Sequence, residues 1–196
     1  MVNNFKIIKE LLDFPNDDIF YFLQIIKRKK ENPEMPKSEI VLSCHHITSI
    51  EHLERLEDEI IGYCDSFNAR AYINLNKRSF KRVGLETLKS IATYIAQDDY
   101  KSIRKAFNSA AGKCSSDSDK KWVLDFDYKP TSVDWLIELK GYLYALEPLI
   151  VNKVITTIPT KNGIHVITKP FNPQKFKKDF PDVDIHKNNP TILYSP

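Results

Sequence analysis

The 196-residue sequence lacks the features that mark secreted and membrane proteins. Its three cysteines, Cys44, Cys64 and Cys114, are odd in number and form no C-x-x-C pair, so we expect reduced thiols and not a disulfide framework. No apolar run approaches the ~20 residues of a membrane-spanning helix. Charges come too early in the N-terminal segment for a secretory signal. We therefore expect a cytoplasmic protein with no membrane partner.

Zinc-binding patterns, internal repeats and low-complexity tracts are also missing. Cys44, His45, His46 and His52 lie close together in the sequence but fit no four-ligand zinc pattern. The chain is 42% hydrophobic and 28% charged, which is ordinary for a globular protein. Its length allows one large domain or two lobes that share a core.

The net charge is small, but the charged residues are unevenly distributed along the chain. The net charge is +3, but residues 70–121 carry twelve Lys and Arg against five Asp and Glu, and residues 151–196 carry seven against three. Residues 51–69 instead hold six acids and one base. Two basic segments favour a polyanionic partner, although lysines scattered over a solvated surface would give the same counts. The densest basic cluster is Lys77, Arg78, Lys81 and Arg82.

The first half of the chain predicts a mixture of strands and helices. Residues 19–29 and 39–47 read as a hairpin-like pair across a proline-containing loop, and residues 69–76 read as a further strand. Thr48 and Glu51 have the spacing of a capping box in front of an apolar helical stripe. A second stripe predicts another helix, and a further helical stretch follows at about 99–110. The members of this second stripe are Leu85, Leu88, Ile91, Ala92 and Ile95.

The second half predicts a small sheet with helices on one side. Residues 112–119 are small and polar, as in a linker, and residues 120–128 read as a strand. Thr131 and Asp134 then open a helix. Two strands follow, joined at Asn162-Gly163, a hairpin signal because both residues tolerate positive φ. A short basic helix at 173–180 and one or two closing strands complete an α+β arrangement that leaves the other sheet face open.

Two carboxylates interrupt the apolar strand at 120–128. Side chains alternate along a strand, so Asp125 and Asp127 share the face opposite Leu124 and Phe126. The pair spans about 7 Å, which lets both carboxylates reach one or two hard cations such as Mg²⁺ or Mn²⁺. A solvated edge strand is the structural alternative.

The turn at 160–165 is the second candidate. His165 lies two residues after Gly163, and Lys161 lies within the turn. Backbone N–H groups, a lysine and a histidine together suit phosphate binding. An ordinary hairpin with an exposed histidine is the alternative.

The third candidate is the acidic run "FPDVDIH" at 180–186. Asp182 and Asp184 project to the same strand face, so alternation does not choose between them. We choose Asp184 because Pro181 leaves Asp182 at the strand's entry.

Together the stretches "WVLDFD", "GIH" and "VD" resemble the three motifs of the archaeo-eukaryotic primase superfamily, which includes the primase-polymerases. The resemblance is strongest over residues 121–168. It implies a mixed α/β N-terminal lobe at 1–111 packed on an RRM-like antiparallel lobe at 112–196, the two forming one catalytic domain.

The resemblance also implies a function, namely DNA primase or polymerase activity in replication. A nucleotide would be transferred from a nucleoside triphosphate to a 3′-hydroxyl. The DNA partner would be a single-stranded template or a primer-template. A separate helicase or replication protein would be a further partner. Asp125, Asp127 and Asp184 would hold two Mg²⁺ or Mn²⁺ ions, and His165 would contact the triphosphate. The remaining nucleotide contacts would come from Lys161, Gly163, Arg70, Lys77 and Arg78.

Two other classes stay open. A metal-dependent nuclease or phosphoesterase would use the same carboxylates, with His165 as general base and water as the nucleophile. A nucleic-acid-binding module that kept the fold without catalysis would bind unchanged after loss of both aspartates. The arginine that many primase relatives place after the third motif is not present in "KNNPTILY".

Overall fold

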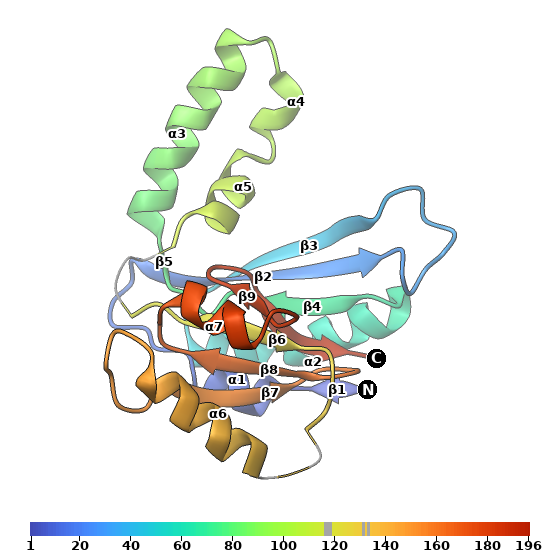
Figure 1. Cartoon of the computed structure of the whole chain (residues 1–196). Coiled ribbons are helices and arrows are strands. Elements are labelled where there is room, and N and C mark those ends of the chain that lie inside the picture. The colour runs from blue at the N-terminus through green and yellow to red at the C-terminus, as the bar shows by residue number, and fades with distance from the viewer. Residues whose placement is uncertain (116–118, 131, 133) are drawn as a thin grey trace.

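The computed structural model describes residues 1–115, 119–130, 132 and 134–196, which form seven helices and ten strands in an α+β fold (Figure 1). Both sheets are antiparallel. The first sheet follows the order β1 (Val2–Asn3), β10 (Thr191–Ser195), β4 (Arg70–Ile73), β2 (Ile19–Arg28) and β3 (Glu39–Ile47), with β5 (Arg78–Ser79) pairing to β2.

The long strand β2 organises the first sheet because both of its faces are used. It forms the expected hairpin with β3, with Tyr21 opposite Ile47 and Arg28 opposite Glu39. Its odd-numbered residues, such as Leu23, enter the main core with α1 (Phe5–Lys9) and α2 (Ile50–Phe67). Its even-numbered Phe20 and Phe22 enter a smaller core under the helices that follow β5.

Helix α2 begins one residue later than the sequence predicts. Its N-cap is Ser49, whose hydroxyl accepts a hydrogen bond from the backbone N–H of His52 at 3.0 Å. Thr48, the expected cap, instead places its hydroxyl 3.0 Å from Nδ1 of the His52 ring. The helix itself is confirmed: Leu53 and Ile60 are buried along its apolar stripe.

A three-helix arm, α3 (Phe80–Ala96), α4 (Tyr100–Ile103) and α5 (Ala106–Lys113), rises from the first sheet (Figure 1). The predicted helix is confirmed as α3, but most of its apolar stripe lies outside the core. Leu85, Leu88 and Ile95 are more than half exposed, and Val83 is the α3 residue that reaches the core. The spacing is amphipathic, but the arm projects too far from the sheet to bury it.

The second sheet has the order β7 (Val154–Pro159), β8 (Ile164–Thr168), β6 (Trp122–Phe126) and β9 (Asp184–His186). Helix α6 (Asp134–Ala145) follows β6 and helix α7 (Pro173–Asp179) follows β8, giving a β-α-β-β-α-β unit. Thr131, the expected start of α6, lies outside the described residues.

Helices cover one face of this second sheet, as the sequence predicts. Trp122, Leu124 and Phe126 point into a core with Leu143 of α6 and Phe176 of α7. The opposite face is not open along its whole length, which corrects the expectation. Val123, Ile158 and Ile167 share a core with Ile192 and Tyr194 of the first sheet, so the free surface narrows to the end that carries Asp125 and Asp127.

One strand of the predicted lobe at 112–196 pairs with the first sheet. Strand β10 leaves the second lobe and pairs with β1 and β4, so residues 191–195 belong to the first sheet. This crossing ties the two sheets together beside the carboxylate end of β6. None of the helices in the described ranges has the length and apolarity needed to cross a membrane.

Candidate functional site

A cleft of about 400 Å³ opens where the two sheets meet, and we call it the carboxylate cleft. The first sheet contributes side chains from β2, β3, β4 and β10, and the second contributes side chains from β6, β8 and β9 together with the β7–β8 turn. The polar lining includes Arg28, Lys30, Glu39, Arg70, Tyr72, Asp125, Asp127, Lys161, His165 and His186.

Asp125 and Asp127 lie in this cleft, on the sheet face that the strand alternation predicts. Asp125 is the last polar residue of β6, and its side chain is 32% exposed. Asp127 follows the end of the strand and is exposed. The cleft therefore brings both carboxylates to a surface that a ligand can reach.

His165 connects the two sheets at the floor of the cleft. It sits directly opposite Asp125 in the β6–β8 ladder, and its Nε2 lies 3.3 Å from Oδ1 of Asp125. Its Nδ1 lies 2.8 Å from Oγ1 of Thr191, a fully buried residue of β10. The hydrogen bond with His165 is the strongest influence holding the pKa of Asp125 below its ordinary value, and partial burial opposes it. Thr191 thus fixes the imidazole that orients one carboxylate.

Gly163 allows the register that places His165 of β8 opposite Asp125 of β6, for a reason that the sequence does not show. The expected hairpin is confirmed between β7 and β8, but neither Asn162 nor Gly163 has the positive φ that the sequence signal rests on. The turn is closed instead by Thr160, whose N–H donates to the carbonyl of Gly163 and whose hydroxyl accepts from its N–H. A Cβ on residue 163 would lie 1.9 Å from the carbonyl oxygen of Phe126. Glycine is needed because the backbone of the turn touches the backbone of the carboxylate strand.

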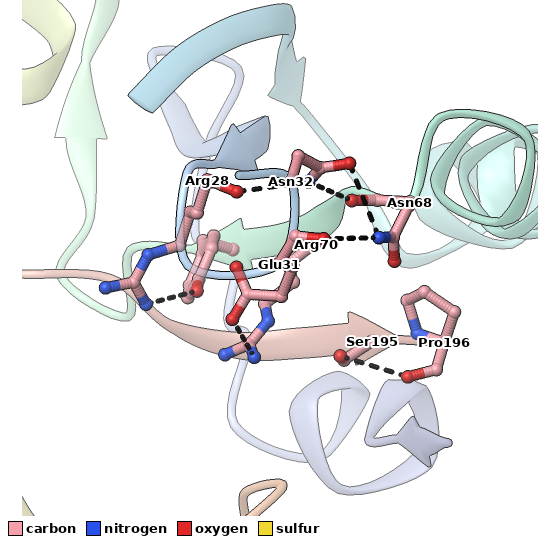
Figure 2. A network of polar contacts seen from close by, with 8 residues as sticks. Arg28, Glu31, Asn32, Asn68, Arg70, Ser195 and Pro196 are labelled. Carbon is pink, nitrogen blue, oxygen red and sulfur yellow. Dashed lines mark hydrogen bonds and ion pairs between the residues drawn. The ribbon is translucent and has the colours of Figure 1, made fainter. Parts of the chain in front are cut away.

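Positive side chains from both sheets join the carboxylates in the lining of the cleft. Arg28 donates from Nη1 to the hydroxyl of Tyr72 at 3.3 Å, a bond that raises the pKa of Arg28. Arg70 donates from Nη2 to Glu31 at 2.6 Å, and the loop that carries Glu31 is held by Asn32 and Asn68 (Figure 2). The ion pair is mostly buried, with 17% and 14% of the two side chains exposed. Lys161 reaches the cleft from the turn.

Three of the predicted site residues lie elsewhere. Arg78 is fully buried and donates to the carbonyls of Ala111 and Asn76, both at 2.6 Å, and to Asn188. Lys77 forms an ion pair with Asp13 at 2.5 Å. The basic cluster around residues 77–82 is therefore not one exposed surface.

The third carboxylate is separated from the first two. Asp184 is paired in register with Asp125, yet its side chain is 74% exposed and lies 3.8 Å from Nζ of Lys177. Neither Asp184 nor its alternative Asp182 lines the cleft. His186, two residues along the same strand, does line it.

Sequence reasoning missed several residues of the cleft. The same alternation that placed Asp184 on the carboxylate face also places His186 there, so this residue had a local signal. No local sequence signal points to Arg28, Tyr72 or Thr191, because each of them reaches the cleft only through the pairing of distant strands.

The donor set fits one hard cation better than two. Mg²⁺ is commonly held by one or two carboxylates, with water and substrate phosphates completing its shell, and Asp125 and Asp127 provide that pair. In the part of the chain that the structure describes, no three His, Cys, Asp or Glu side chains gather as a metal-binding group. A second ion held by Asp184 does not fit this arrangement of side chains.

Comparison with protein-family models, with curated proteins and with solved structures finds no match to this chain. The chemistry of the cleft therefore carries the functional argument.

Proposed function

We propose that this protein is a nucleotidyltransferase of the primase-polymerase type, which adds a nucleotide from a nucleoside triphosphate to a 3′-hydroxyl of a nucleic acid. The observation that carries the proposal is the carboxylate cleft, whose lining holds Asp125 and Asp127 together with Arg28, Arg70 and Lys161. A triphosphate and its cation need both kinds of charge in one site.

The arrangement of strands supports the same class. The order β9-β6-β8-β7 with helices after β6 and β8 is the order of an RRM-like lobe, which the motif resemblance implies for the second half of the chain. The motif "WVLDFD" ends at the cleft, and "GIH" is its neighbour in the sheet. Two motifs that are separate in the sequence thus lie on neighbouring strands, which supports the proposal.

The chain's own side chains have distinct tasks in the proposed reaction. Asp125 and Asp127 would hold Mg²⁺ or Mn²⁺, which lowers the pKa of the attacking hydroxyl and offsets charge on the departing pyrophosphate. Lys161 and Arg28 attract the triphosphate. The 3′-oxygen forms a bond to the α-phosphorus, the bond from that phosphorus to the bridging oxygen of the β-phosphate breaks, and the hydroxyl proton passes to water.

His165 acts as a positioning residue in this structure because both ring nitrogens have partners in the protein. Thr191 holds one nitrogen and Asp125 the other. The triphosphate contact that the resemblance implies for His165 would require one of these two contacts to open at the cleft surface, where 12% of the side chain is exposed. Loss of the imidazole should weaken nucleotide binding more than template binding, by roughly ten- to a hundredfold for one charge-assisted hydrogen bond.

The test is incorporation of labelled nucleotide by the purified protein on primed and unprimed templates with Mg²⁺ or Mn²⁺. Asp125→Ala and Asp127→Ala should abolish incorporation while the protein stays folded. Asp182→Ala is the matched control, since this exposed carboxylate lies outside the cleft and its loss should leave the rate unchanged. Asp184→Ala measures whether a third carboxylate takes part.

Two results would contradict the proposal. Incorporation that survives the double change at Asp125 and Asp127 would remove the cleft from the chemistry. Cleavage of a labelled oligonucleotide by the wild-type protein without nucleoside triphosphate, lost in the same variants, would identify a metal-dependent nuclease instead.

A further inference from the structure

A second cavity, of about 610 Å³, lies between the edge strand β3 and helix α5, and we call it the β3–α5 groove. One wall is the outer strand, residues 40–44, with Gln24 of β2 behind it. The other wall is the α5 face that carries Lys105, Asn108 and Lys113. No part of the proposed chemistry uses this groove.

The rim of the groove is basic. Lys37, Lys105 and Lys113 are exposed, and none of them has an ion-pair partner among the residues whose structure is described. Lys105 and Lys113 are eight residues apart across α5, with Ser109 midway, so all three lie on one face of the helix. Glu39 is the acidic residue of the lining.

The groove continues into the carboxylate cleft. Glu39 lines both cavities. Strand β2 pairs with β4 without a register shift over residues 23–26, although its register with β3 shifts between Ile25 and Ile26. The even-numbered side chains of β2 over this stretch therefore share one face. Gln24 on that face lines the groove, while Ile26 and Arg28 line the cleft. One sheet surface therefore runs from α5 to the carboxylates.

We propose that the β3–α5 groove binds a single strand of nucleic acid through its phosphates and leads it to the carboxylate cleft. The assignment rests on the proposed function, because a template with unpaired bases must reach the site of nucleotide transfer. Lysines without an ion-pair partner in the described part of the chain suit a polyanion. Phe22, the aromatic residue of the lining, is 1% exposed, so it offers no ring for base stacking. Binding should be independent of base sequence.

The experiment measures binding without catalysis. A fluorescent 12-nucleotide oligothymidylate is titrated with the whole protein, without nucleoside triphosphate or divalent cation, from 50 to 200 mM salt. The test variant carries Lys37→Gln, Lys105→Gln and Lys113→Gln. The matched control loses three exposed lysines outside both cavities, through Lys101→Gln, Lys140→Gln and Lys178→Gln.

Each lysine–phosphate contact on a single strand contributes roughly −0.7 to the slope of log affinity against log salt, so the groove variant should lose about 2 from its slope. Over the fourfold salt range the wild-type affinity should then change roughly 15- to 20-fold more than that of the groove variant. The control should keep the wild-type slope.

Three results would overturn the groove assignment: a groove variant that binds like the wild type, a control that loses as much, or a duplex of equal length that competes as well as a single strand. Failure of the proposed function looks different. A protein that binds the oligonucleotide through the groove but incorporates no nucleotide would leave the groove in place and remove the transferase.

Discussion

Replacing Gly163 by alanine tests whether contact between two backbones sets the register of the carboxylate cleft. The new Cβ would lie 1.9 Å from the carbonyl oxygen of Phe126, 2.9 Å from its carbonyl carbon and 3.0 Å from the carbonyl carbon of Asp127. All three atoms belong to the backbone at the end of β6, so no side-chain rotation relieves the clash. The turn and β6 must move apart.

The size of that movement follows from the contact itself. An ordinary contact begins near 3.4 Å, so the backbones must separate by about 1.5 Å. Overpacking of this kind costs about 1–3 kcal/mol, and we expect the upper end because strand ladders resist separation. His165 is two residues from the clash and opposite Asp125. A misplacement of about 1 Å at reacting groups lowers rates by roughly a hundredfold, so nucleotide incorporation should fall by that factor.

Urea unfolding and nucleotide incorporation measure the two effects. Gly84→Ala is the control, because residue 84 lies within helix α3 and its added Cβ meets nothing within 4 Å. Alanine at a helical glycine should stabilise the protein by about 0.5–1 kcal/mol. The two glycine changes should therefore have opposite signs. A Gly163→Ala protein as stable as the wild type would show that the close contact between the turn and the end of β6 does not constrain residue 163 to glycine.

Two further predictions concern buried and half-buried charges. Arg78→Met should lower the free energy of unfolding by about 2–4 kcal/mol, since buried carbonyl acceptors lose their donor at roughly 1–3 kcal/mol each. The control is the neighbouring Lys77→Met, which removes an ion pair with an exposed carboxylate and should change the free energy of unfolding by less than about 1 kcal/mol. Equal losses for the two variants in urea unfolding would contradict this prediction. The lowered pKa of Asp125 stabilises the folded state above the ordinary aspartate pKa of ~3.9, and this stability is lost as pH falls through the lower folded-state value. Asp125→Asn should therefore flatten acid unfolding in that range, whereas an unchanged acid profile would show that the His165 contact contributes nothing.

Much of the candidate site follows from local pattern. Alternation along residues 122–127 places Asp125 and Asp127 on the face away from Leu124, and the structure has them there. The apolar spacing of α2 and the hairpin of β2 with β3 are equally local properties. These predictions succeed because side-chain direction within one element depends on its own period.

Other expectations failed at points where a second element decides. Arg78 has the charge of a phosphate ligand, yet three protein acceptors from distant segments surround it. Asp184 has the correct face, but its place on the outermost strand leaves it in solvent beside Lys177. The apolar stripe of α3 is real, and the core ends before reaching it.

The sequence by itself determined which residues share a strand or helix face, and hence that two carboxylates stand together beside a glycine–histidine turn. The tertiary structure was needed to show that β10 crosses into the first sheet, that Thr191 fixes His165, and that Arg28 lines the same cleft as the carboxylates. The difference lies in the sequence separation over which each interaction acts. Periodicity acts over a few residues, whereas the cleft depends on contacts between strands that are far apart in the chain, whose pairing follows from burial of the shared core.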